Sequence, residues 1–212
     1  MRREFHVRFC EGGGVRFPSA TRRNVYVRSK RAADRVMEGL VALYATLKLR
    51  VNVTKSAVAR AGERSFLGYS FWVAPGKIVK RRVAPKALKT MQERIRDITS
   101  RNGGRSIRHV VRVLRSYLVG WKAYFHLADT PGIFADMDKW LHRRLRMLIV
   151  KQSKRGTTLF RLLRTRGVPE RVARAAAAHC QRWWAMAAHG ALQAAFPSRY
   201  FDALGVPRLG PT

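Results

Sequence analysis

The chain has 212 residues, of which 44 are Lys or Arg and only 12 are Asp or Glu, so its formal net charge is +32. Hydrophobic residues make up 47% and aromatic residues 10%, enough to build a core, which excludes a purely disordered basic tail. A compact body with this charge repels itself unless a polyanion neutralises it. The composition therefore predicts a nucleic-acid partner, with an anionic membrane surface as the alternative.

The cysteines indicate neither a metal site nor a disulfide framework. Cys10 and Cys180 are the only two, and they form no CxxC pair and no Cys/His cluster at zinc spacing. No apolar run approaches the roughly 18 residues of a transmembrane helix, and the basic start lacks the apolar segment of a secretory signal. We therefore expect a cytoplasmic protein that binds no metal, cofactor, membrane or small-molecule substrate.

Residues 1–23 are predicted to be unstructured. They contain six arginines and the run Gly12-Gly13-Gly14, with little periodicity. The glycines do not form a P-loop, because no Gly-Lys-Ser/Thr follows to hold phosphate and magnesium. A flexible segment is the interpretation that this composition favours.

Regular patterns begin at Asn24. The sequence predicts a strand over 24–27, a helix over about 30–48 with Ser29 as its N-cap, and a second strand around Val51 and Val53. A third strand is expected over 66–72. The turn signal Pro75-Gly76 then predicts a hairpin whose second strand spans 77–83.

After Pro85 the pattern becomes helical. Five helices are predicted, over about 85–101, 107–126, 133–151, 159–166 and 169–194, and we expect Leu114, Leu118, Trp121 and Trp140 to be buried among them. The expected fold class is mainly α with a small α+β piece at the N-terminus. The boundary between the two pieces is placed near residues 76–84.

Basic residues are concentrated on the second and third of these helices. The first four on the second helix are separated by steps of 3, 4 and 3, which places them on one face. From Lys139 to Pro169 there are ten basic residues and no acidic one, whereas an ordinary solvated face mixes both signs. This pattern predicts a surface that binds RNA phosphates. The candidate residues are Arg105, Arg108, Arg112, Arg115, Lys122, Lys139, Arg143, Arg144, Arg146, Lys151, Lys154 and Arg155.

Aromatic side chains can also stack on unpaired bases. Helical spacing favours a place in the core for most of them. Trp183 and Trp184 cannot both face the same way on a helix, so one is expected in the core and the other at a second packing surface or a partner.

No catalytic constellation is recognisable. Metal-dependent nucleotidyl transfer needs carboxylates that converge on two cations about 4 Å apart, and the acidic residues here are scattered. Asp34 and Glu38 share a helix face with arginines, which favours surface pairing. Asp136 and Asp138 lie near a helix start, where negative charges interact favourably with the helix dipole.

Several motifs resemble, in order, the reverse transcriptase–maturase proteins encoded by group II introns. The segments 24–37, 52–56 and 66–69 are similar to the last part of the polymerase palm, and residues 85–156 resemble the maturase-specific, or X, domain that forms the thumb. The most specific segments are Leu118-Val-Gly-Trp-Lys-Ala-Tyr-Phe125 and the end of the chain, with Trp183-Trp184 and residues 195–205. The resemblance implies that 24–80 is a palm remnant and 81–212 is the thumb and maturase-specific domain with a C-terminal tail. Within the palm remnant, Phe66, Leu67, Gly68 and Tyr69 match the strand that grips the primer.

The sequence departs from this family at the catalytic motif. The family has Tyr-Ala-Asp-Asp just before the position of Asn24, whereas this chain has Ser19-Ala-Thr-Arg-Arg23. Codons for Val-Arg-Tyr-Ala that are shifted by one nucleotide can spell Ser-Ala-Thr-Arg, so we hypothesise that residues 1–23 are an out-of-frame remnant of a truncated gene.

Three functions are then open. The first is an RNA-binding maturase fragment that binds group II intron RNA, helps it splice and has no catalytic residues of its own. The second is a polymerase half that is active only with its missing N-terminal part, in which case an RNA/DNA hybrid is a further partner. The third is a generic basic protein that binds nucleic acid.

Overall fold

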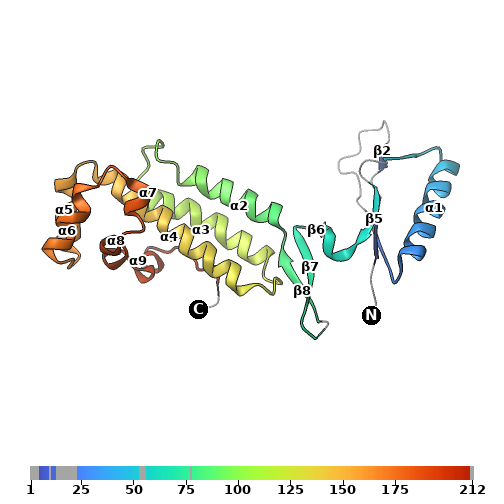
Figure 1. Ribbon diagram of the computed structural model, residues 1–212. Coiled ribbons are helices and arrows are strands. Elements are labelled where there is room, and N and C mark those ends of the chain that lie inside the picture. Colours follow the sequence, from blue (N-terminus) through green and yellow to red (C-terminus); the bar gives the residue numbers. More distant parts are fainter. Residues whose placement is uncertain (1–4, 10, 13–22, 53–55, 77, 211–212) are drawn as a thin grey trace. The chain divides into compact units, whose positions relative to one another are not determined.

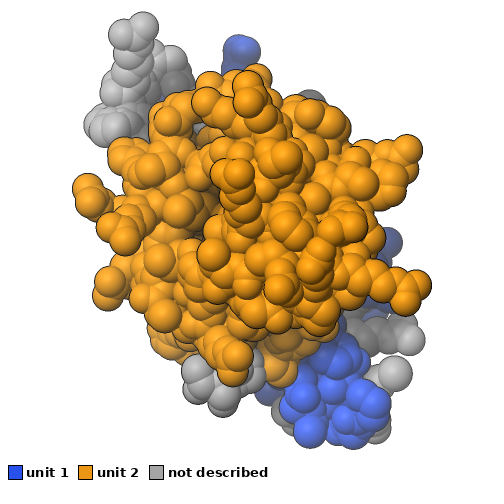
Figure 2. All heavy atoms as spheres, turned by 90° about the vertical axis from the view of Figure 1, so that its left-hand side faces the viewer, with its two compact units in different colours: residues 1–84 blue, residues 85–212 orange. Residues whose placement is uncertain are grey.

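The computed structural model describes residues 5–9, 11–12, 23–52, 56–76 and 78–210. The chain forms two compact units, Met1–Ala84 and Pro85–Thr212, which Figure 2 distinguishes by colour. The division falls at the end of the interval 76–84 that the change of sequence pattern indicates. None of the helices in the described ranges is both long and apolar enough to cross a bilayer.

The first unit contains an antiparallel sheet whose middle strand is β1, Phe5–Phe9. It pairs on one side with β3, Arg23–Val27, and on the other with β5, Ala57–Arg60. A second short pair joins β2, Glu11–Gly12, to β4, Arg50–Val51.

The expectation of an unstructured N-terminal segment is therefore wrong for 5–9 and 11–12. The reason lies in the sequence, since Phe5, Val7 and Phe9 alternate with His6 and Arg8, the period of a strand. A strand inside the sheet also counts against the out-of-frame hypothesis. Residues 13–22, where the hypothesised frameshift falls, lie outside the described residues.

Helix α1, Lys30–Thr46, packs against this sheet. The side chain of Ser29 caps it, as predicted, by accepting a 3.2 Å hydrogen bond from the Ala32 N–H. Ala33 and Tyr44 are its buried residues. The apolar side chains around them come from β3, β4, β5 and α1 itself, and they are Val25, Val27, Met37, Leu40, Val51 and Val58.

A separate three-stranded sheet consists of β6, Ser65–Phe66, β7, Tyr69–Ala74, and β8, Ile78–Val83, and a 3₁₀ turn at Ala61–Glu63 precedes it. The hairpin around Pro75-Gly76 is present, because β7 and β8 pair along their whole length. The continuous strand expected over 66–72 is not. Leu67 and Gly68 have φ angles of 49° and 78° and form a two-residue turn, so the segment folds back on itself.

The second unit is helical, and Figure 1 shows α2, α3 and α4 lying along one another. They span Pro85–Ile98, Ile107–Tyr124 and Pro131–Ser153. Their apolar faces form one core in which Leu114 and Leu118 are fully buried. Trp121 and Trp140 are only partly buried at its edge, which corrects the expectation that both would be core residues.

Five shorter helices follow, and they span Gly156–Thr165 (α5), Glu170–Ala178 (α6), Trp183–Met186 (α7), Gly190–Ala195 (α8) and Ser198–Ala203 (α9). The single helix expected over 169–194 is thus three helices. His189 explains one of the breaks, because its Nδ1 accepts the Ala191 N–H and so starts α8. The breaks let Met186, Ala187 and Leu192 all reach the core.

Candidate nucleic-acid interface

Three arginines of helix α3 and a fourth just before its N-cap face solvent. Ser106 caps the start of α3 by accepting a hydrogen bond from the His109 N–H. The opposite face of the helix is buried and consists of Val110, Val111, Leu114 and Leu118. The arginines are Arg105, Arg108, Arg112 and Arg115, all exposed, and together they are the α3 stripe. Within the described part of the chain none of their guanidinium groups forms an ion pair. Their charge is therefore available to an external anion.

Lys122, at the end of α3, has an internal partner. Its Nζ donates a 2.8 Å hydrogen bond to the backbone oxygen of Arg208 in the C-terminal tail. The tail also reaches Arg115, since a Cβ added at Gly205 would lie 3.5 Å from an Arg115 guanidinium nitrogen. The tail therefore lies beside Arg115, at the C-terminal end of the α3 stripe.

Arg144 of α4 is engaged inside the unit. Its Nε donates to the hydroxyl of buried Thr99 at 2.7 Å, and its guanidinium lies 5.5 Å from the ring centroid of Trp140. Burial lowers the pKa of this guanidinium, and the neighbouring cations Arg96 and Arg101 lower it further. Arg144 thus connects α4 to the end of α2 and is less available to phosphate than the α3 stripe.

Arg143 and Arg146 are also partly buried. The guanidinium of Arg143 donates to the Trp184 carbonyl oxygen, at 3.1 Å from Nη2, and stacks 4.1 Å from the Trp184 ring centroid. Arg146 has a buried Nε for which the described residues provide no hydrogen-bond partner. Burial lowers the pKa of Arg146, and the nearby charge of Arg143 lowers it further.

The remaining predicted lysines and arginine differ in their surroundings. Lys139 forms a 3.2 Å ion pair with Asp136, which precedes the acid-free interval by three residues. Lys151 Nζ lies 4.0 Å from the Trp183 ring centroid. Lys154 and Arg155 are exposed in the turn between α4 and α5. The twelve candidates therefore do not form one uniform surface.

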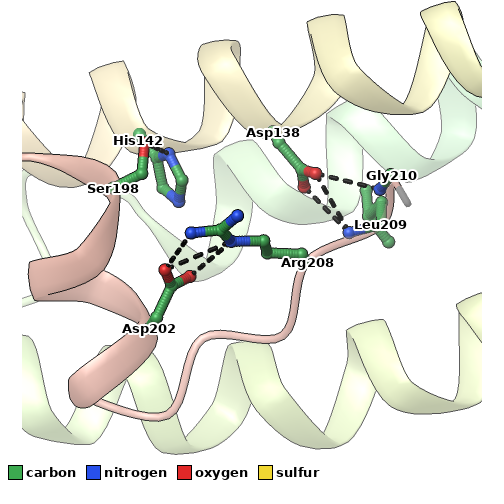
Figure 3. A network of polar contacts seen from close by, with 7 residues as sticks. All are labelled: Asp138, His142, Ser198, Asp202, Arg208, Leu209 and Gly210. Carbon is green, nitrogen blue, oxygen red and sulfur yellow. Dashed lines mark hydrogen bonds and ion pairs between the residues drawn. The ribbon is translucent and has the colours of Figure 1, made fainter. Parts of the chain in front are cut away.

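The C-terminal tail is held by carboxylates that the sequence did not single out for this role (Figure 3). Asp138 accepts the backbone N–H groups of Leu209 and Gly210, at 3.0 Å from each. Asp202 pairs through both oxygens with Arg208. This hydrogen bond lowers the pKa of the Asp202 carboxyl. Asp138 and Arg208 were missed because their partners lie far away in the sequence, beyond the reach of helical periodicity.

His142 lies beside this network and is buried. Its ring stacks on Phe201, with centroids 5.1 Å apart, and its Nδ1 lies 3.2 Å from the Ser198 hydroxyl. Burial lowers the pKa of His142, an effect that Asp138 partly offsets. The lowered pKa favours the neutral form of the ring, which belongs to the packing between α4 and α9.

The four primer-grip candidates lie at the β6–β7 hairpin of the first unit. Phe66 and Tyr69 pair across the turn that Leu67 and Gly68 form, and Leu67 is 64% exposed. The four residues therefore form a tight turn with an exposed apolar side chain, and the continuous strand expected there is not what the structure has.

Among the described residues no three His, Cys, Asp or Glu side chains come together as metal ligands would. The side chains that the structure does bring together are basic residues, tryptophans and the carboxylates that hold the tail. It suits binding of an anionic partner.

Comparison with known families adds one finding. Residues 88–167 match the family model of the group II intron maturase-specific domain, whereas no curated protein matches the chain. The matched segment runs from α2 to the turn after α5 and includes the α3 stripe and all of α4. The palm assignment of residues 24–80 lies outside it and stays a prediction. The match supports a maturase role in group II intron splicing for the segment that carries the basic helices.

Proposed function

We propose that the chain is an RNA-binding maturase fragment that binds group II intron RNA, assists its splicing and does not copy RNA by itself. The match of residues 88–167 to the maturase-specific domain supports the intron as the partner. The net charge of +32 supports a polyanionic ligand. The absence of paired aspartates before Asn24 supports a role without polymerisation.

The observation that carries the proposal is the α3 stripe. Arg108, Arg112 and Arg115 face solvent at helical spacing on α3, with Arg105 just before its N-cap. No carboxylate in the described ranges pairs with these four arginines. Such a row fits a line of phosphates on structured RNA, which proteins recognise mainly by its shape and backbone.

RNA binding at several salt concentrations tests this role. Replacing Arg108, Arg112 or Arg115 by alanine should reduce the slope of log affinity against log salt by roughly 0.7 to 0.9, because one fewer counterion is released. Arg112→Glu with Arg115→Glu should weaken binding more than the double alanine variant. Arg174→Ala is the matched control, because Arg174 is also an exposed arginine but already pairs with Glu170. Wild-type slopes in all the α3 variants would exclude the stripe as the RNA-binding face.

Two further assays separate the proposal from its rivals. Equal affinity for group II intron RNA and for random RNA of the same length would favour a generic basic protein. Magnesium-dependent primer extension by the pure chain would contradict the claim that it lacks polymerase activity. Faster splicing of the intron at limiting magnesium, lost in the α3 variants, is the expected positive result.

A further inference from the structure

Trp184 is an exposed tryptophan on a firmly anchored helix. The helix α7 packs against α4, and its last residue Met186 and the adjacent Ala187 are buried in the core. Trp183 packs against the same core, whereas Trp184 points away from it and is 38% exposed. The indole of Trp184 is thus exposed to solvent, on a helix whose backbone is held by the core.

Arg143 holds this indole in place. Its guanidinium stacks on the ring, 4.1 Å from the centroid, and donates through Nε and Nη2 to the carbonyl oxygen of the same residue. The two hydrogen bonds fix the guanidinium beside the backbone of Trp184, and the guanidinium in turn packs against the ring. A ligand that binds the ring therefore loses little conformational entropy in ordering it.

The surroundings of the two tryptophans carry positive charge without a counter-ion. Lys151 Nζ lies 4.0 Å and Arg101 Cζ 5.2 Å from the Trp183 ring centroid. Arg146 has a buried Nε that no described residue hydrogen-bonds, and it lies close enough to Arg143 for that charge to lower its pKa. In the described part of the chain, no carboxylate forms an ion pair with any of these four cations.

An exposed aromatic ring beside unneutralised cations fits an unpaired nucleotide. The ring offers a stacking surface to a base, and the cations offer charge to the phosphates on either side. A duplex cannot use the ring, because its bases already stack on each other. An anionic membrane is less suited, since α7 has four residues and is too short for an apolar membrane-binding face.

We propose that Trp184 is a stacking platform for an unpaired base of the bound RNA. The cations of the same region, among them Lys151 and Arg101 over the adjacent Trp183, bind phosphates of this strand, while the α3 stripe binds paired regions. The inference rests on the proposed function only in taking RNA as the ligand. It assigns unpaired and paired RNA to different elements of the second unit, α7 and the α3 stripe.

The test compares the full chain with Trp184→Ala and Trp184→Phe. The ligands are an oligouridylate of about ten nucleotides, within the usual size range of single-strand sites, and an RNA duplex of equal charge. Trp184→Ala should weaken oligouridylate binding by about 5- to 150-fold, the value of one base–aromatic stack, and duplex binding by less than about twofold. Trp184→Phe should restore part of the loss because a ring remains. Oligouridylate should quench the tryptophan fluorescence of the wild type more than that of Trp184→Phe.

A matched control is Tyr124→Ala, which removes another exposed aromatic ring from the same unit and should leave oligouridylate binding unchanged. Equal oligouridylate affinity in the wild type and Trp184→Ala, or an equal loss with Tyr124→Ala, would overturn the inference. So would a loss seen only with anionic lipid vesicles. These outcomes are distinct from failure of the proposed function, which would appear as no preference for intron RNA while Trp184 still binds oligouridylate.

Discussion

Arg144 and Arg112 both belong to the basic pattern of the sequence, yet the structure predicts opposite results when each is replaced by alanine. Arg144 donates to Thr99 and lies over Trp140. Arg112 is exposed, and its guanidinium pairs with no carboxylate among the described residues. Arg144→Ala should lower the free energy of unfolding of the second unit, whereas Arg112→Ala should weaken RNA binding at unchanged stability.

The magnitude follows from the contacts that are lost. A hydrogen bond from a charged donor contributes about 1.5–3 kcal/mol, and a cation–π contact at a partly exposed site about 0.5–1 kcal/mol. Repulsion from Arg96 and Arg101 disappears with the charge, which offsets part of the loss. We expect a net cost of about 1–3 kcal/mol for Arg144→Ala and under about 0.5 kcal/mol for Arg112→Ala.

Urea unfolding of the full chain, followed by far-ultraviolet circular dichroism and tryptophan fluorescence, measures both variants. A double-mutant cycle with Thr99→Val isolates the hydrogen bond, and a coupling of about 1 kcal/mol or more is expected. The reasoning is refuted if Arg144→Ala unfolds like the wild type and reduces the salt slope of RNA binding as much as Arg112→Ala does. Arg144 would then be a phosphate ligand.

Three further predictions concern the second unit. Leu114→Ala, at a site with 0% exposure, should cost about 2–5 kcal/mol in urea unfolding. Gly156→Ala should cost about 1–3 kcal/mol, because its Cβ would lie 2.7 Å from the Ala177 carbonyl oxygen. Gly120→Ala, on the last turns of α3 where an added Cβ meets nothing within 4 Å, should stabilise by up to about 1 kcal/mol. The lowered pKa of His142 means that the unfolded chain takes up a proton first on acidification, so stability should fall as pH drops below the ordinary value of 6.5. His142→Phe, which keeps the stack on Phe201, should flatten the pH dependence of the thermal midpoint between pH 7 and that lowered pKa; an unchanged slope would contradict this role.

Local signals in the sequence predicted most of the helices. Ser29 caps the helix that it was expected to cap, and the mainly helical fold with a small N-terminal sheet is confirmed. Two errors fall where a local break interrupts an otherwise continuous pattern. The turn at Leu67-Gly68 divides an apolar run that reads as one strand, and His189 starts a helix within an alanine-rich interval that reads as continuous.

The candidate site shows the same limit. Spacing placed Arg108, Arg112 and Arg115 on one exposed face, because periodicity within one helix determines that property. It could not separate Arg144 from them, since the difference depends on Thr99, which lies 45 residues earlier in the chain. The role of Asp138 in holding the tail could not be predicted for the same reason, since its partners Leu209 and Gly210 lie 71 and 72 residues later.

The strand order β3–β1–β5 has a consequence for how the first unit acquires its structure. The central strand is the first to leave the ribosome, but one of its partners, β5, follows only after α1 has been made. The pairing of β1 with β5 therefore has to close the long loop between these two strands. Such non-local contacts form slowly. The long helices of the second unit instead pack against neighbours in sequence, α2 with α3 and α3 with α4. The helical unit, although synthesised later, is thus the part whose topology permits rapid folding.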